Sequence, residues 1–356
     1  MPKKIRIKDI ARLAGVSAGT VDRVLHNRGN VSTKARQAVE AVLEKVDYKP
    51  NIHVSALSLK RTYKIVITTP VVSPGEYWES IHHGFRYAKE AYSNLKLTIE
   101  VLTYNQYDIF SCREMFRQIA EMEMDALIIG PTFHNETYTL CEKMDERNIP
   151  YIFVDSNNDG THPLAFFSSD HYMCGTLMAK LITSLIPVDS KIGILHAVRV
   201  GNQSANSTIL RKRGFMDYIS KQEAAYQVLR IPFSVEEPKN NESYLSRFFS
   251  VHHDIPGVVV MNSRGNYVAN YLHSNQIHDV KMVCLDLTTP NVEALKKGRI
   301  DFLIGQEPEY QGFRAMKTML EHLIFNKPVK RENYVQLDIL TRENIGFYKR
   351  FNNIML

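Results

Sequence analysis

Beyond residue 62, the apolar residues form short runs separated by longer amphipathic stretches. In the first half, runs of strand length cover residues 64–70, 96–102, 125–130 and 150–154, and helical patterns cover about 76–93, 109–122 and 135–147. The second half repeats the scheme with runs at 166–168, 191–195, 227–231, 257–261, 281–285 and 301–305. Continuous β-branched runs that alternate with helices are typical of parallel sheets covered on both faces. We therefore expect an α/β fold with two lobes, each a doubly wound parallel sheet.

The first 46 residues show helical periodicity instead. Ile7, Ile10, Ala11 and Ala14 form one apolar stripe at helical spacing. Gly15 can turn the chain, and the Ser17 hydroxyl can cap a second helix, in which Val21 and Val24 point inward. With a third helical stretch over residues 33–46, this pattern predicts a helix-turn-helix unit that offers its second helix to the DNA major groove. A three-helix bundle without nucleic acid is the alternative.

The charge distribution favours DNA binding. Residues 1–61 contain 13 lysine and arginine residues against 5 aspartate and glutamate residues, whereas the other 295 residues contain 31 against 33. The positive excess therefore lies in the first sixth of the chain. A localised basic module is typical of proteins that bind phosphates of nucleic acids.

Several short motifs in this module resemble the headpiece of LacI/GalR-type transcription regulators. They are Asp9-Ile10-Ala11, Ala14-Gly15-Val16-Ser17, Thr20-Val21, Arg23-Val24-Leu25, Val31-Ser32 and Tyr48-Lys49-Pro50-Asn51, followed by Ala56-Leu57. The resemblance implies a headpiece over residues 1–48 and a hinge over 49–62. It also implies a set of DNA-binding residues: Ile7, Ser17, Ala18, Gly19, Thr20, Arg23, Asn30, Ser32 and Leu57.

Within that set, the resemblance places Ala18, Gly19 and Arg23 toward the bases. Ala18 and Gly19 are nearly bare where better-known members carry long polar side chains, so Arg23 is the main candidate for a bidentate contact to guanine. Leu57 matches the hinge leucine that wedges into the minor groove, and such wedges bend the duplex. The alternative for the hinge is a flexible linker in which the leucine occurs by chance.

The two lobes, over residues 63–356, resemble the periplasmic-binding-protein fold used by LacI-type effector domains. Chain crossings near Ser168, Gln306 and Asn326 would place residues of about 63–165 and 307–326 in lobe 1 and residues 166–306 and 327–356 in lobe 2. The first helix of this domain is preceded by Ser73-Pro74-Gly75-Glu76, which reads as a capping box.

Ligands of doubly wound sheets bind beyond the carboxyl ends of the strands. The polar and aromatic residues at such positions are Tyr77, Trp78, Asp155, Asn262, Asp286 and Gln306, with Arg211 near a helix start. Each matches a position at which sugar-binding members of this fold grip hydroxyl groups, and carboxylates and amides supply the acceptors and donors that a sugar needs. Any one of them alone is more readily a turn former than a ligand-binding residue. We expect a small effector, most readily a sugar or sugar derivative, between the lobes.

Length and composition limit the other possibilities. At 356 residues the chain is long enough for two or three domains, and it has no apolar run of membrane-spanning length. The basic N-terminus is not followed by an apolar segment, and the four cysteines are scattered without a CxxC, so we expect a cytoplasmic protein with no disulfide, metal or cofactor.

Enzyme motifs are missing from the sequence. It contains no phosphate-binding G-x-x-x-x-G-K-[ST], no dinucleotide G-x-G-x-x-G after a strand and no G-x-S-x-G nucleophile elbow. We therefore expect no catalytic residues, and the resemblance to LacI/GalR-type regulators implies an allosteric regulator whose homodimer reads a pseudo-palindromic operator. A sugar-binding protein without a DNA role, and less readily an α/β enzyme, are the alternatives.

Overall fold

The computed structural model describes residues 7–25, 29, 31–45, 61–198, 200, 205–234 and 239–348. The expected contacts of Asn30 and Leu57, and the hinge apart from residues 61 and 62, lie outside these residues. No helix in the described part of the chain is long and apolar enough to cross a membrane.

In the described residues of the headpiece there are three helices, α1 (Ile7–Ala14), α2 (Ala18–Leu25) and α3 (Thr33–Lys45). Ile10, Val21 and Val39 are fully buried at its centre. Gly15 turns the chain between α1 and α2 with φ at +64°, a conformation that glycine adopts without steric cost. The predicted helix-turn-helix unit is confirmed.

The larger domain contains two six-stranded sheets. The strands of the first sheet lie in the order β11-β5-β4-β3-β1-β2, and those of the second in the order β12-β10-β9-β8-β6-β7. All pairs are parallel except β10 with β12. The first sheet comprises β1 (Tyr63–Pro70), β2 (Leu97–Tyr104), β3 (Ala126–Ile129), β4 (Tyr151–Asp155), β5 (Ala165–Ser168) and β11 (Glu332–Tyr334). The second comprises β6 (Lys191–Val198), β7 (Gln227–Ser234), β8 (Gly257–Val260), β9 (Lys281–Leu285), β10 (Phe302–Gly305) and β12 (Asp338–Leu340).

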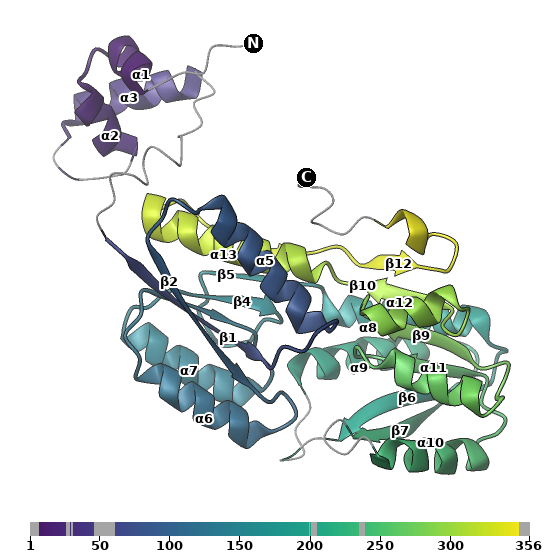
Figure 1. Ribbon diagram of the computed structural model, residues 1–356. Helices are drawn as coiled ribbons and strands as arrows, with labels where there is room; N and C mark the ends of the chain where they lie inside the picture. The colour runs from purple at the N-terminus through teal and green to yellow at the C-terminus, as the bar shows by residue number, and fades with distance from the viewer. Residues whose placement is uncertain are drawn as a thin grey trace. The chain divides into compact units, whose positions relative to one another are not determined.

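Helices cover both faces of each sheet (Figure 1). In lobe 1, α6 (Ile109–Ala120) and α7 (His134–Glu146) cover one face, and α5 (Tyr77–Ala91) and α13 (Pro308–Phe325) cover the other. In lobe 2, α10 (Lys239–Val251), α11 (Gly265–Ser274) and α12 (Thr289–Lys296) cover one face, and α8 (His171–Leu185) and α9 (Asn206–Ile219) cover the other. A short 3-10 helix spans Ile345–Phe347. The doubly wound α/β architecture expected from the apolar runs is confirmed.

The expected lobe boundaries need two corrections. Strand β5 pairs with β4 and therefore belongs to lobe 1, so the first crossing follows Ser168 and residues 166–168 are not part of lobe 2. The chain does not cross near Asn326, because β11 still pairs with β5 in lobe 1 and only β12 joins lobe 2. The third crossing is therefore at residues 335–337.

The start of α5 also differs from the expected capping box. The helix begins at Tyr77, and the backbone N–H of Gly75 donates to the carboxylate of Glu79, 2.8 Å away. The Glu76 side chain instead turns toward lobe 2. Its contact there is part of the site described below.

Candidate functional site

The headpiece presents the first turns of α2 to solvent. Ser17, Ala18, Gly19 and Arg23 are exposed, Thr20 is half-buried, and Ser32 is exposed before α3. The Ser17 hydroxyl accepts the backbone N–H of Thr20 at 3.1 Å, and that of Ser32 accepts the N–H of Ala35 at 3.3 Å. These caps fix the starts of two helices, so the predicted base-facing residues lie on a rigid, open helix. Ile7 differs from them because its side chain packs partly against the core.

All seven predicted ligand-binding residues line one cavity between the lobes: Tyr77, Trp78, Asp155, Arg211, Asn262, Asp286 and Gln306. Tyr77 and Trp78 come from α5, Asp155 ends β4 and Arg211 lies in α9, whereas the other three follow strands of the second sheet. The topology explains this convergence, because the carboxyl ends of parallel strands in both lobes face the same space.

Asp155 and Asp286 occupy equivalent places in the two lobes. Each lies at the carboxyl end of the strand that is third from the β11 or β12 edge of its sheet. Each also has a left-handed backbone, with φ at +70° for Asp155 and +72° for Asp286. Aspartate tolerates this conformation better than most residues. Burial raises the pKa of Asp155 to about 6, although Arg211 and a hydrogen bond from Tyr77 oppose the shift. Burial raises the pKa of Asp286 as well.

Arg211 holds the centre of a buried hydrogen-bond network. Its guanidinium donates to the carbonyl of Met261 at 3.2 Å, to the Gln306 amide oxygen at 3.2 Å and to Nδ1 of His171 at 3.0 Å. Burial and the charge of Arg211 lower the pKa of His171 well below its usual value, so the ring is neutral. Because Nδ1 accepts, Nε2 carries the proton and donates to the carbonyl of Asp155, 2.8 Å away. His171 is a network member that the sequence did not indicate.

Gln306 joins this network to Asp286. Its amide nitrogen donates to a carboxylate oxygen of Asp286 at 2.7 Å, and the other carboxylate oxygen accepts from Ser263 at 2.6 Å. The Gln306 amide oxygen also accepts from the Ser169 hydroxyl at 2.6 Å. The network therefore runs from the end of β4 in lobe 1 to the end of β9 in lobe 2 and fixes the polar groups that face the cavity.

Two further side-chain contacts join the lobes. Arg264 of lobe 2 makes a bidentate ion pair with Glu76 of lobe 1. Asn206 of α9 donates to the side chain of Asn158 at 2.9 Å. Glu76 and Arg264 both line the cavity, and neither was predicted. A signal for Arg264 did exist, since it lies two residues after Asn262.

The described residues contain no group of three or more histidine, cysteine, aspartate or glutamate side chains that could hold a metal ion. The four cysteines are buried and unpaired. Burial raises the pKa of each thiol, for instance that of Cys174 to about 11, which disfavours the reactive thiolate.

Two family models match the chain. The model described as "Periplasmic binding protein domain" matches residues 65–327, and that of "Bacterial regulatory proteins, lacI family" matches residues 6–51. The sucrose operon repressor of Streptococcus mutans is 26% identical over 291 residues, which cover 80% of this chain and 82% of that protein. The regulator DegA of Bacillus subtilis is 28% identical over 183 residues. That match covers 51% of this chain and spans about half the length of DegA, 52%.

Solved structures agree with these matches. A protein from Bacteroides fragilis assigned to the LacI transcriptional regulators is 31% identical, with a TM-score of 0.78, over 81% of this chain and all of that one. The glucose-galactose binding protein GanP of Geobacillus stearothermophilus shares the fold, with a TM-score of 0.69 at 18% identity over 80% of this chain and 99% of that one. The sequence relatives are transcriptional regulators, not enzymes. With its helix-turn-helix headpiece and periplasmic-binding-protein domain, the chain belongs to the lacI family of bacterial regulatory proteins.

Proposed function

We propose that the chain is a cytoplasmic transcriptional regulator, most simply a repressor, that binds a pseudo-palindromic operator as a homodimer. A small ligand, of the sugar class, binds between the lobes and changes the operator affinity. The proposal rests chiefly on one observation, the shared cavity between two lobes in a chain that begins with an open helix-turn-helix. A ligand can shift the operator affinity only if it binds one lobe arrangement better than another.

The chemistry of the cavity supports a polyhydroxylated ligand. Carboxylates of Asp155 and Asp286 can accept hydrogen bonds from hydroxyl groups, and the Asn262 amide can donate and accept. Trp78 packs edge-on against Tyr77, with ring centroids 5.7 Å apart, and offers an aromatic surface for a sugar ring. The sucrose operon repressors and the glucose-galactose binding protein among the similar proteins have names that refer to sugars.

The test begins with the full chain and a pool of duplexes with a randomised centre. We expect selection to enrich a pseudo-palindrome, because a two-fold dimer reads two half-sites. Arg23→Ala should weaken binding to the enriched duplex by roughly 10-fold to 100-fold, the value of about 1–3 kcal/mol for a lost bidentate base contact. Arg213→Ala, which removes the same charge from an exposed position in lobe 2, should change the affinity less than about twofold.

A thermal-shift panel of sugars, sugar phosphates, polyols and nucleosides on the same preparation should then identify the effector. Asn262→Ser keeps an oxygen that can accept the N–H of Arg264 but removes the amide donor. We expect it to weaken the effector about tenfold while operator binding is retained. Failure to enrich any duplex would contradict the regulator and favour a sugar-binding protein without a DNA role.

A further inference from the structure

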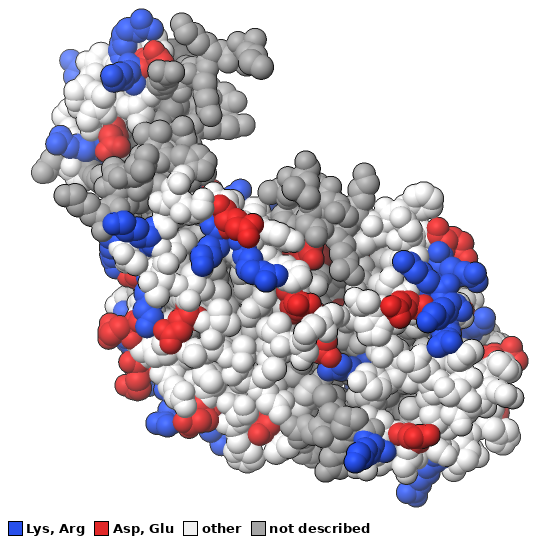
Figure 2. Space-filling view, in the orientation of Figure 1, with Lys and Arg blue, Asp and Glu red and all other residues white. Residues whose placement is uncertain are grey.

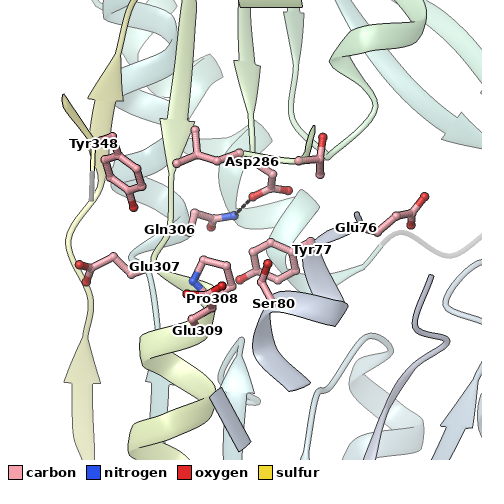
Figure 3. A pocket seen from close by; sticks show the side chains of 11 residues that line it. Glu76, Tyr77, Ser80, Asp286, Gln306, Glu307, Pro308, Glu309 and Tyr348 are labelled. Atoms are coloured by element: carbon pink, nitrogen blue, oxygen red, sulfur yellow. Dashed lines mark hydrogen bonds between the residues drawn. The ribbon is translucent and has the colours of Figure 1, made fainter. Parts of the chain in front are cut away.

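A second cavity adjoins the effector cavity and shares part of its wall, and Figure 3 shows the residues that line it. Four residues line both cavities, namely Glu76, Tyr77, Asp286 and Gln306. The remaining wall comes from the second crossing between the lobes, the start of α13, the loop after β9, and Ser80 and Tyr348. The second cavity thus lies at the junction of the two lobes, and the predicted effector residues form only part of its wall.

Two buried polar atoms of this wall have no hydrogen-bond partner among the residues that the structure describes. They are Oγ1 of Thr288 and Oε2 of Glu309, and both residues are only 6% exposed. The nearest ion-pair partner of the Glu309 carboxylate is His83, whose Nδ1 is 3.9 Å from the other oxygen, Oε1. A buried carboxylate oxygen without a donor is costly. The Glu309 oxygen therefore calls for a hydrogen-bond donor that the described residues do not supply, and the Thr288 hydroxyl can accept from the same group.

The charges around the cavity indicate what kind of donor this is. Four carboxylates line it, from Glu76, Asp286, Glu307 and Glu309, and the lining includes no lysine, arginine or histidine. Glu76 is neutralised by Arg264, and Asp286 is held by Ser263 and Gln306. Glu307 and Glu309 remain to face a ligand. Burial and repulsion from Asp338 raise the pKa of Glu307, as expected for a carboxylate without a close cation.

The rest of the wall is apolar or aromatic. Tyr77, Leu287, Pro308 and Tyr348 line the space beside the carboxylates, and Figure 3 shows Tyr77 and Tyr348 on opposite sides of Gln306. Such a surface suits a short hydrocarbon chain, and aromatic rings also attract cations. Carboxylates at one end and an apolar wall at the other match an ammonium group on an aliphatic body.

We propose that this second cavity is a further small-molecule site, which binds a primary aliphatic amine in its protonated form. The ammonium group donates to Oε2 of Glu309 and to Oγ1 of Thr288, and its alkyl chain lies against Leu287 and Pro308. Because Gln306 and Asp286 form part of both cavities, an amine bound here adjoins the effector site directly. The amine position differs from the proposed sugar position, although the two share the wall that Asp286 and Gln306 form, and it does not depend on the identity of the sugar.

Three probes of the same length test the charge requirement: butylammonium, 1-butanol and butyrate, each titrated into the full chain and followed by saturation-transfer NMR. We expect butylammonium to bind at least tenfold more tightly than 1-butanol, and butyrate not to compete with it. Glu309→Gln and, separately, Thr288→Val should each weaken butylammonium at least fivefold. Glu123→Gln, at a side chain that is 97% exposed, controls for the loss of one negative charge.

The outcomes distinguish this site from the effector cavity. Asn262→Ser should leave butylammonium binding within twofold of the parent chain, even if it abolishes the response to a sugar. Equal binding of the three probes, or a Glu309→Gln variant that melts normally and binds butylammonium as before, would overturn the proposal. So would loss of amine binding in Asn262→Ser, since that would assign the amine to the effector cavity.

Discussion

At the scale of single residues, the effector cavity contains groups whose burial opposes folding. Asp155 is buried, has a left-handed backbone and has a pKa raised to about 6 from an ordinary value of 3.8. Above pH 6 the folded protein must therefore hold a buried negative charge that the unfolded chain exposes to water. Such groups are typical of binding sites, where a ligand supplies the missing hydrogen bonds.

Asp155→Asn should therefore stabilise the protein at neutral pH. Between pH 4 and 6 the folded chain binds more protons than the unfolded chain, so the penalty from Asp155 grows as the pH rises through this window. Two units of raised pKa correspond to at most about 3 kcal/mol above pH 6. We expect the variant to melt several degrees higher than the parent at pH 7.5, with the difference shrinking toward pH 4.

Differential scanning calorimetry at pH 7.5 and 4.5 checks this expectation. Glu223→Gln, at an exposed position, is the matched control and should shift the midpoint at neither pH. A lower midpoint for Asp155→Asn at pH 7.5 would mean that the ion pairing with Arg211 outweighs the cost of burial.

The residue scale also shows what the sequence could predict. Asp155, Asn262, Asp286 and Gln306 stood out because each ends an apolar run, and strand ends of one sheet edge must meet. Glu76 and His171 gave no such signal. Glu76 pairs with Arg264, a partner 188 positions away, and His171 is defined by buried contacts to Arg211 and Asp155. No local pattern in the chain encodes such long-range pairs.

At the scale of elements, the position of Arg211 depends on how closely α8 and α9 pack. A Cβ atom on Gly175 of α8 would lie 1.8 Å from the carbonyl oxygen of Arg211, and one on Gly214 of α9 would lie 1.9 Å from that of Tyr172. The two glycines therefore let the helix backbones touch. This contact fixes the backbone from which the Arg211 guanidinium reaches the cavity.

Gly175→Ala should force the two helices apart. Because backbone atoms cannot yield as a flexible side chain can, we expect a loss of at least about 2 kcal/mol of stability, with weaker effector binding as Arg211 moves. Gly346→Ala is the control, since a Cβ there meets nothing within 4 Å. Urea unfolding followed by circular dichroism measures the difference, and equal midpoints for both variants would contradict the argument.

Element prediction from sequence was limited mainly by length. The ten longer strands coincide with apolar runs rich in β-branched residues, which periodicity detects. Strands β11 and β12 contain three residues each and include polar side chains such as Glu332 and Asp338, so they carry no periodic signal. These residues form strands because each pairs with the edge of an existing sheet. Because the sequence analysis did not predict the two strands, it placed the third crossing too early in the chain.

At the scale of the whole domain, charged side chains of both signs are mixed over the face seen in Figure 2. The ion pair between Glu76 and Arg264 is different, because it joins the lobes across the cavity. Its side chains are only 30% and 15% exposed, so water and salt screen it less than a surface pair. It favours the arrangement in which the lobes enclose a ligand.

Arg264→Gln should therefore loosen the closed arrangement. We expect effector affinity to fall about 5-fold to 30-fold, the equivalent of about 1–2 kcal/mol, and small-angle scattering to give a larger radius of gyration without ligand. The exchanged pair, Glu76→Arg with Arg264→Glu, should recover part of the affinity. A double variant no better than the worse single variant would show that the contribution comes from individual contacts to the ligand.

The three crossings have a consequence for synthesis on the ribosome. The headpiece is one continuous segment of the chain, so it can fold as soon as it emerges. Lobe 1 cannot, because α13 and β11, which complete it, are translated only after nearly all of lobe 2. A growing chain therefore carries a finished DNA-reading module well before it has a finished ligand sensor. A messenger RNA truncated before codon 308 would encode a complete headpiece without a complete ligand-binding domain.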